Sequence, residues 1–358
     1  MKRLLLALAV ALATYGTFAM LQSQPAWVAP LQSPSVGDLN EPLVVEFPVP
    51  GNPERVVVEG LGRVWFTLPQ QNLIGRLVVT SSTDFSVETY PVPTVNSYPY
   101  DIDWAAGAVW FTQRDANKIG RLDPGTGFIT EYTIPTPASS PTGIDVVAGA
   151  PTRVWFVEQD GDRLGTLVFT STLDYEMVEM ALPPQYAGAQ LQDISVSAGG
   201  SAWFTAPGLG YLGTYNGATG SFTLRVAPGG GEPWSVKIAP GGVPVWFTDR
   251  TGGRIGGYFP MTIGDFRMFP LPGTGRAPND LVLMGGKVWF TEEQGPYVTV
   301  LSLSPTSFRS FGVGLGALGG IDADANQHVW FAMSDAMKIG VWRPPYFHRV
   351  FLPVVQRG

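Results

Sequence analysis

The chain has 358 residues, of which 45% are hydrophobic and 14% charged, with 44 glycines and 32 prolines. So many turn-forming residues favour short strands over long helices, and the hydrophobic fraction excludes a disordered chain. The formal net charge is -7 and no Lys/Arg-rich run follows Arg3, which excludes the basic surface of a nucleic-acid-binding protein. There is no cysteine, so disulfides, thiolate metal sites and cysteine nucleophiles are excluded as well.

The N-terminal residues have the features of a targeting segment and a linker. Lys2 and Arg3 precede the apolar run 4–13, and small residues follow at 17–19, which predicts a cleaved signal peptide over residues 1–19. The alternative is an uncleaved membrane anchor, but the apolar run is shorter than the ~20 residues that a spanning helix needs. Residues 20–41, rich in Gln, Pro and Ser, are predicted to be a flexible exported linker. We therefore expect a secreted or cell-surface protein with no membrane span after cleavage.

A Trp-Phe pair recurs along the rest of the chain. The intervals between successive copies are 45, 45, 48, 43, 43 and 41 residues. A glycine stands ten residues after each tryptophan, except in the sixth copy, where Thr299 takes its place. The tryptophans are Trp65, Trp110, Trp155, Trp203, Trp246, Trp289 and Trp330. Repeats of this period are typical of solenoids and propellers.

Each copy contains four short strand patterns separated by turn residues. Residues 141–146 and 154–156 mark the first two strands in the third copy, and 118–122 and 128–134 mark the last two in the second. Four strands in ~43 residues make a propeller blade, so the chain is predicted to be an all-β, seven-bladed β-propeller over residues 42–343. The Trp and Phe of each copy are predicted to fill the spaces between blades, contributing ~2–3 kcal/mol each.

The seventh copy has an ambiguous fourth strand. Residues 44–50, before the first Trp-Phe pair, match the fourth-strand pattern of residues 130–135. We therefore predict that the N-terminal strand completes the last blade. The segment 349–353 is the rival for that place, and with N-terminal closure residues 344–358 form a short C-terminal tail.

Some copies spell out a longer consensus. Residues 110–144 contain Trp-Phe-Thr, Lys-Ile-Gly-Arg-Leu, Ile-Thr-Glu-Tyr and Ile-Pro-Thr-Pro, and the last copy reads Trp-Phe-Ala-Met before its Lys-Ile-Gly. Over residues 42–343 these units resemble those of virginiamycin B lyases, the streptogramin lyase family. The resemblance implies a seven-bladed propeller and an enzyme that opens a cyclic depsipeptide by elimination at an ester, with a divalent metal, usually Mg²⁺.

The resemblance also implies where working residues should lie. They are a His in the turn entering blade six, a Glu and a His in the turn entering blade seven, and a Glu directly after Trp-Phe-Ala-Met. This sequence has Asn279, Ala317, Gly319 and Ser334 at those four positions. Elimination needs a general base and an acid, which these residues cannot supply near neutral pH, so no catalytic residue is assigned. The chain has only two histidines, His328 and His348, which we expect at the surface.

The loops that enter the first strand of each blade are expected to gather at one mouth of the central channel, the default ligand site of a propeller. They present an acidic and aromatic ring with one nearby base, Arg55. Trp234 stands outside the Trp-Phe series, and it either contacts a sugar or peptide ligand or caps a blade interface. The predicted ligand-binding residues are Tyr100, Asp101, Gln192, Asp193, Trp234, Asn279, Asp280 and Glu292.

Three of the carboxylates, Asp101, Asp193 and Asp280, occupy equivalent places in three blades. As oxygen ligands they are candidates for holding Mg²⁺ or Ca²⁺. The alternative is that each carboxylate accepts hydrogen bonds from the backbone of its own turn. No nucleophile elbow, phosphate loop or zinc motif occurs in the sequence.

Two hypotheses for function follow. The first is a secreted, monomeric, non-catalytic propeller that binds a small molecule, glycan or peptide at its mouth. An intact scaffold without the family's acid–base residues favours it. The second is a metal-assisted lyase or lactonase/esterase that acts on a cyclic ester through relocated carboxylates, with Asp101, Asp193, Asp280 and Glu292 as the candidates.

Overall fold

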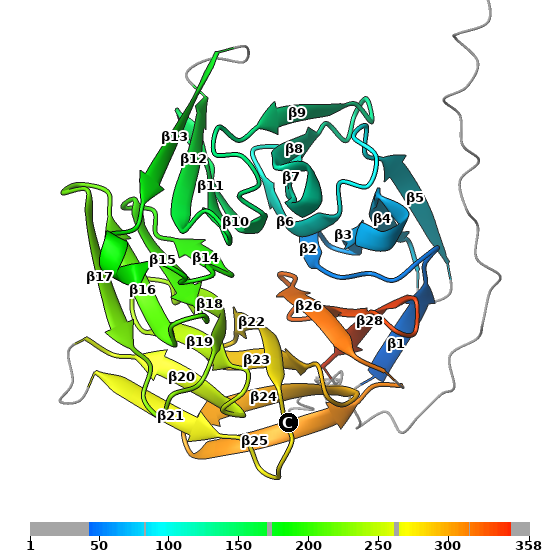
Figure 1. Cartoon of the computed structure of the whole chain (residues 1–358). Coiled ribbons are helices and arrows are strands. Elements are labelled where there is room, and N and C mark those ends of the chain that lie inside the picture. The colour runs from blue at the N-terminus through cyan, green and yellow to red at the C-terminus, as the bar shows by residue number, and fades with distance from the viewer. Residues whose placement is uncertain (1–42, 82–83, 170–173, 261–264, 315, 345–358) are drawn as a thin grey trace, which may run out of the picture.

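The structure, a computed structural model, describes residues 43–81, 84–169, 174–260, 265–314 and 316–344. They form seven four-stranded antiparallel sheets arranged in a ring around a central channel (Figure 1). The predicted seven-bladed β-propeller is therefore confirmed. The predicted signal peptide and linker, and the C-terminal tail beyond residue 344, lie outside the described residues.

Each blade runs from an innermost first strand at the channel to a fourth strand at the outer edge. Blades one to four consist of β2 (Val56–Gly60), β3 (Arg63–Leu68), β4 (Leu73–Val79) and β5 (Phe85–Pro91); β6 (Pro99–Ala105), β7 (Ala108–Gln113), β8 (Lys118–Leu122) and β9 (Ile129–Thr133); β10 (Pro141–Val147), β11 (Thr152–Glu158), β12 (Arg163–Phe169) and β13 (Tyr175–Ala181); and β14 (Ile194–Val196), β15 (Ser201–Ala206), β16 (Tyr211–Asn216) and β17 (Ser221–Val226).

The remaining three blades continue the ring in chain order. They consist of β18 (Pro233–Ile238), β19 (Val245–Asp249), β20 (Arg254–Tyr258) and β21 (Phe266–Pro270); β22 (Pro278–Met284), β23 (Lys287–Glu292), β24 (Tyr297–Leu303) and β25 (Thr306–Gly312); and β26 (Leu318–Ala323), β27 (Val329–Met333), β28 (Lys338–Arg343) and β1 (Leu43–Pro48). The helices among the described residues are single 3₁₀ turns, η1 (Pro69–Gln71), η2 (Arg114–Ala116) and η3 (Pro184–Tyr186). None of these is long enough to cross a membrane.

The N-terminal strand closes the ring, as predicted. β1 pairs antiparallel with β28 from Leu43 opposite Arg343 to Pro48 opposite Lys338. Its inward residue Phe47 is 2% exposed and packs on Trp330. Both ends of the propeller are thereby held in one sheet.

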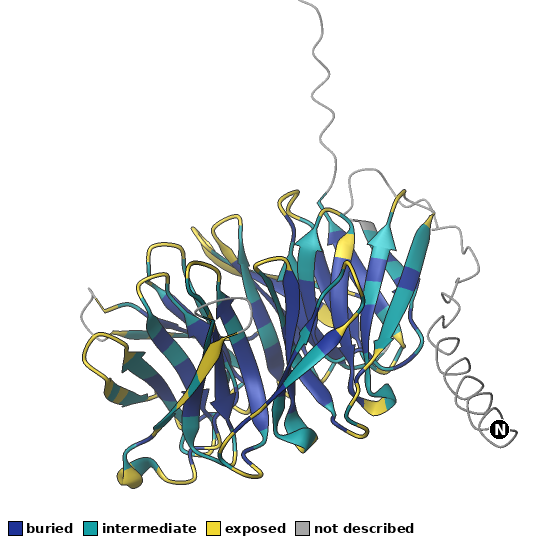
Figure 2. Cartoon of the chain, turned by 90° about the horizontal axis from the view of Figure 1, so that it is seen from above, coloured by how far each residue is buried: buried dark blue, intermediate teal, exposed yellow. Residues whose placement is uncertain are grey.

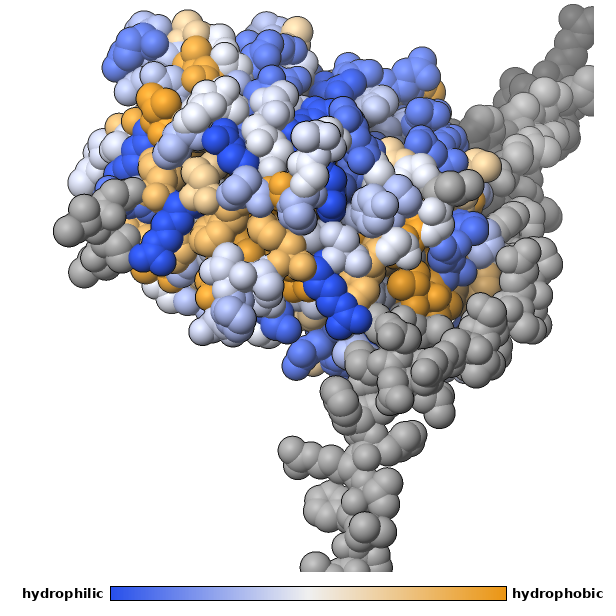
Figure 3. All heavy atoms as spheres, turned by 90° about the horizontal axis from the view of Figure 1, so that it is seen from below, coloured by the Kyte–Doolittle hydropathy of each residue, from blue (hydrophilic) through white to orange (hydrophobic). Residues whose placement is uncertain are grey.

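The core consists of seven clusters, one at each interface between neighbouring blades. Each contains the repeat tryptophan of one blade and the repeat phenylalanine of the next, as Trp65 and Phe111 illustrate for the first two blades. Buried residues are concentrated within the strands and exposed residues in the turns (Figure 2). The outer edge of the ring mixes apolar surface with hydrophilic side chains (Figure 3), in agreement with the half-buried Phe266 on β21 and Phe311 on β25.

The glycine ten residues after each tryptophan makes room for the phenylalanine ring. Gly120 lies opposite Phe111 in the strand pairing, and a Cβ atom added there would lie 2.1 Å from the ring. The same crowding recurs in every blade that has this glycine. In blade six the position is Thr299, whose hydroxyl donates to Glu292 at 2.6 Å.

We predict that Gly120→Ala lowers the free energy of unfolding by about 1–3 kcal/mol, because the added methyl overpacks the core against Phe111. Gly60→Ala is the matched control, since a Cβ there has no neighbour within 4 Å. Denaturant unfolding followed by tryptophan fluorescence measures both. Equal stability of the two variants would contradict this account of the glycine.

Candidate functional site

The first strands of the seven blades surround a cavity of about 100 Å³ within the channel. Its lining is strongly polar, with six aspartates and two basic residues. The polar lining residues are Arg55, Tyr100, Asp101, Asp103, Asp145, Gln192, Asp193, Lys237, Asp280 and Asp322. Such a volume has room for water, and it is smaller than the ~300–1,000 Å³ pockets that take drug-sized ligands.

A threonine after each of five Trp-Phe pairs fixes the first strands to one another. Thr112 Oγ1 accepts the N–H of Asp101 in its own blade at 3.0 Å and donates to the carbonyl of Thr142 in the next blade at 2.7 Å. The same pair of bonds is made by Thr67, Thr205, Thr248 and Thr291. The sequence signal was present in the Trp-Phe-Thr unit, but this role was not predicted.

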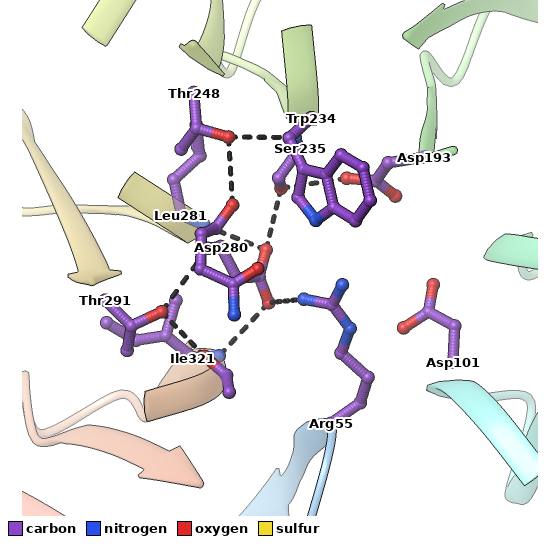
Figure 4. A network of polar contacts seen from close by, with 12 residues as sticks. Arg55, Asp101, Asp193, Trp234, Ser235, Thr248, Asp280, Leu281, Thr291 and Ile321 are labelled. Carbon is purple, nitrogen blue, oxygen red and sulfur yellow. Dashed lines mark hydrogen bonds and ion pairs between the residues drawn. The ribbon is translucent and has the colours of Figure 1, made fainter. Parts of the chain in front are cut away.

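The carboxylates of the three predicted aspartates accept hydrogen bonds from the backbone. Asp101, Asp193 and Asp280 each accept an N–H from the first strand of the following blade, at 2.9, 2.8 and 3.1 Å. Asp193 and Asp280 also accept the N–H of their own next residues, at 2.8 Å each. The hydroxyl of Ser235 lies between these two carboxylates (Figure 4).

The Mg²⁺ or Ca²⁺ site predicted at Asp101, Asp193 and Asp280 stays a prediction. Within the described part of the chain, no three His, Asp or Glu side chains are grouped as metal ligands would be. Hydrogen bonds from backbone N–H groups hold each of the three carboxylates at an interface between two blades. These aspartates therefore join blades.

A second ring of charges lies further along the same strands, and sequence reasoning missed it. Asp103, Asp145 and Asp322 each accept an N–H from the next blade, at 2.7, 2.6 and 2.7 Å. Lys237 of blade five lies in the same cavity. Burial lowers the pKa of Lys237, but the charges of the surrounding aspartates, Asp193 foremost, outweigh it and raise that pKa above its ordinary value.

Burial away from solvent changes the protonation of the carboxyls in this interior. Burial, reinforced by the charge of Asp193, raises the pKa of Asp101 to about 7. Burial and the charge of Asp103 raise the pKa of Asp145 to about 7, and burial raises the pKa of Asp322 to about 6. Some of the aspartates that line the cavity are therefore protonated at neutral pH, which reduces the repulsion among them.

A hydrogen-bonded chain of side chains lies in the wall of the cavity on the side of the mouth. Tyr100 Oη accepts from Arg55 Nη2 at 3.1 Å and from Gln192 Nε2 at 2.7 Å. Arg55 also forms an ion pair with Asp280, at 3.3 Å, across the channel (Figure 4). Arg55 and Tyr100 are each 7% exposed and Gln192 is 3% exposed. Two predicted binding residues, Tyr100 and Gln192, thus come together as a bridge over the channel.

The other predicted binding residues are placed differently. Trp234 is half-buried at the mouth, with the guanidinium of Arg250 4.3 Å from its ring centre. Asn279 is 8% exposed and donates from Nδ2 to the carbonyl of Leu318 at 2.9 Å. Glu292 is fully buried in an ion pair with Arg276, and it is not among the residues that line the cavity.

The turn entering blade seven is packed against the backbone of blade one. Gly320 donates its N–H to the carbonyl of Glu54 at 2.7 Å. A Cβ atom added at Gly319 would lie 2.2 Å from that same carbonyl oxygen. Ser334 donates its hydroxyl to the carbonyl of Pro53 at 2.7 Å. The side-chain space at position 319 is therefore filled by the main chain of the first blade.

The comparisons with known proteins agree with this architecture. The sequence model of the virginiamycin B lyase family matches residues 18–243. The chain belongs to that family. It is 34% identical over 96 residues to the virginiamycin B lyase of Nocardia farcinica, an alignment that spans 27% of this chain and 31% of that relative.

Solved lyase structures match over a much longer range. The virginiamycin B lyase of Staphylococcus aureus is 27% identical, with a TM-score of 0.74, over 85% of this chain and 99% of that one. A catalytically inactive histidine-to-alanine variant of the same enzyme, solved with quinupristin, is 26% identical over 85% of this chain and 99% of that one, with a TM-score of 0.74. The recognised family resemblance is thus confirmed.

We predict that Gly319→His destabilises the fold by about 1–3 kcal/mol, since any side chain there meets the Glu54 carbonyl. Ala317→Glu, on the preceding part-exposed turn, is the control that changes a neighbouring family position without that clash. Thermal and denaturant unfolding measure both variants. A fully stable Gly319→His protein would show that blades seven and one can separate at no cost.

A second prediction concerns pH. Because the Asp101 pKa is raised to about 7, the folded state binds more protons than the unfolded state between pH ~4 and ~7. The contribution of Asp101 to the free energy of unfolding is therefore complete below that window. It is lost as pH rises through the window, by up to ~1.4 kcal/mol per pH unit. Asp101→Asn, which keeps an acceptor for Ile144, should flatten this loss in unfolding experiments. Asp160→Asn, at an exposed turn, should follow the wild type, and an unchanged slope in Asp101→Asn would refute the prediction.

Proposed function

We propose that this protein is a non-catalytic binding member of the virginiamycin B lyase family, which holds a peptide-like ligand on the face of its mouth. The observation that carries the proposal is at Gly319, where the resemblance implies a working histidine. The carbonyl of Glu54 occupies the space that any such side chain would need.

The neighbouring family positions support the same proposal. The amide of Asn279 is engaged by the Leu318 carbonyl and the hydroxyl of Ser334 by the Pro53 carbonyl. Neither side chain can act as an acid or a base near neutral pH, and Ala317 has no polar atom in its side chain, so elimination at an ester has no proton acceptor at these positions. In the Staphylococcus aureus relative, one histidine-to-alanine replacement accompanies loss of catalysis, and that inactive variant was solved with quinupristin. Binding without turnover is therefore within the capacity of the fold.

The mouth offers aromatic rings beside guanidinium groups that also pair with acids, Arg250 with Glu293 and Arg114 with Asp115. Arg250 lies over the ring of Trp234 and Arg114 over the ring of Tyr98, both at 4.3 Å. Tyr98 in turn stacks on Tyr100 at 6.5 Å. Because the cavity of about 100 Å³ beneath is too small for a cyclic peptide, the ligand lies on this face rather than inside the cavity. Partly exposed aromatic rings with adjacent polar groups suit a cyclic peptide that carries its own aromatic residues.

Secretion is part of the proposal. It is supported by the basic start, the apolar run 4–13 and the small residues at 17–19. An extracellular binding protein would meet peptide ligands before they reach the cell.

Titration calorimetry with quinupristin tests the proposal, with mass spectrometry of the ligand after incubation in the presence of Mg²⁺. We expect binding with no change of ligand mass. Trp234→Ala should weaken the affinity about thirtyfold, because an aromatic anchor contributes about 2 kcal/mol. Phe128→Ala, which removes a ring that is 70% exposed in the β8–β9 turn, should bind as the wild type does.

The outcomes separate the two hypotheses. Absence of heat with quinupristin, or equal binding by Trp234→Ala and Phe128→Ala, would refute the proposed ligand face. Ring opening that is lost in Asp280→Ala would instead establish an enzyme that acts through relocated carboxylates.

A further inference from the structure

A second cavity lies between blades seven and one at the opposite end of the strands from the mouth. β26 begins at Leu318 at the mouth and ends at Ala323, so the turn that follows it lies at the far face. The cavity there has a volume of about 240 Å³, and its walls include Val79, Thr80, His328, Trp330 and Arg343. It shares no residue with the channel cavity.

Asp324 fixes the orientation of the histidine in this cavity. Its side chain is 1% exposed and accepts four hydrogen bonds, from the backbone N–H groups of Asn326 and His328, from His328 Nδ1 at 2.9 Å and from Trp330 Nε1 at 3.2 Å. Since a carboxylate only accepts, Nδ1 carries a proton and Nε2 is left for a ligand. Both carboxylate oxygens of Asp324 thus have hydrogen-bond donors from residues 326–330.

Arg343 supplies a second polar group to the cavity wall. It lies at the end of β28, and its Nε is buried with no hydrogen-bond acceptor among the described residues. A buried guanidinium N–H without an acceptor is unfavourable. Arg343 also lines the cavity, so its guanidinium belongs to the wall that an anion bound there would face.

We propose that the cavity binds a small oxyanion, a phosphate or carboxylate group, between Arg343 and His328. The guanidinium matches the planar or tetrahedral oxygens of such an anion. His328 Nε2 donates to it when the imidazole is protonated, and otherwise accepts from a phosphate hydroxyl. Neither sequence reasoning nor the proposed ligand face predicts this site, and it is independent of both.

The test uses the full chain and its small number of histidines. With only His328 and His348 in the sequence, the imidazole NMR signals are assigned by one variant, His328→Asn. Inorganic phosphate is titrated into protein in a buffer free of other oxyanions, and acetate is titrated separately to distinguish a phosphate from a carboxylate preference. We expect saturable shifts of the His328 signals.

Matched arginine variants locate the anion. Arg343→Gln should weaken binding about tenfold or more, because it removes a charged hydrogen-bond donor, and Arg343→Lys should weaken it less. The control is Arg153→Gln, an exposed arginine that stands before Val-Trp-Phe in blade three, as His328 does in blade seven. Circular dichroism checks that each variant is folded.

Each result decides the proposal. Saturable shifts at His328 that Arg343→Gln weakens and Arg153→Gln does not would support it. Wild-type protein that shows no saturable shift with either anion would overturn it, and so would equal weakening by both glutamine variants. The wild-type titration remains decisive even where a variant fails to fold.

Discussion

The packing of a tryptophan from one blade against a phenylalanine from the next is the interaction on which the whole molecule depends. A single blade has two apolar faces and no way to cover both, so its sheet is stable only between neighbours. Trp65 with Phe111 and Trp330 with Phe66 are two instances of one contact repeated around the ring. The channel, its mouth and the far-face cavity exist because this contact holds the seven blades side by side in a ring.

Much of this architecture could be predicted from the sequence because it is periodic. The Trp-Phe pair, the glycine ten residues later and the fourth-strand pattern in residues 44–50 sufficed for blade number and ring closure. The channel chemistry was harder to predict, because which groups meet there depends on seven segments far apart in the chain. Asp101 and Asp280 were recognised as equivalent, but their backbone partners lie in the following blades. Lys237 resembled an ordinary strand residue, and only the ring places it among aspartates.

The inner channel also shows how a fold can use charge for assembly. Each aspartate that lines the cavity accepts a backbone N–H from the first strand of the following blade. These carboxylates therefore join neighbouring blades, as backbone hydrogen bonds join neighbouring strands within a blade. Raised carboxyl pKa values reduce the repulsion that so many acids would otherwise create. The same close approach of first strands brings the Glu54 carbonyl against Gly319 and leaves no space for a larger residue.

Ring closure by β1 has a consequence for how the protein is made. Glu46 and Lys338, which form an ion pair at this seam, are 292 residues apart in the chain. During synthesis β1 is made first, but its partner β28 is made only after the other blades. The pairing of β1 with β28 is therefore the last step of ring formation and the least local in sequence. Until then blade seven has an open edge that another copy's N-terminal strand fits equally well. Dilute conditions during refolding should therefore favour single rings over exchanged dimers.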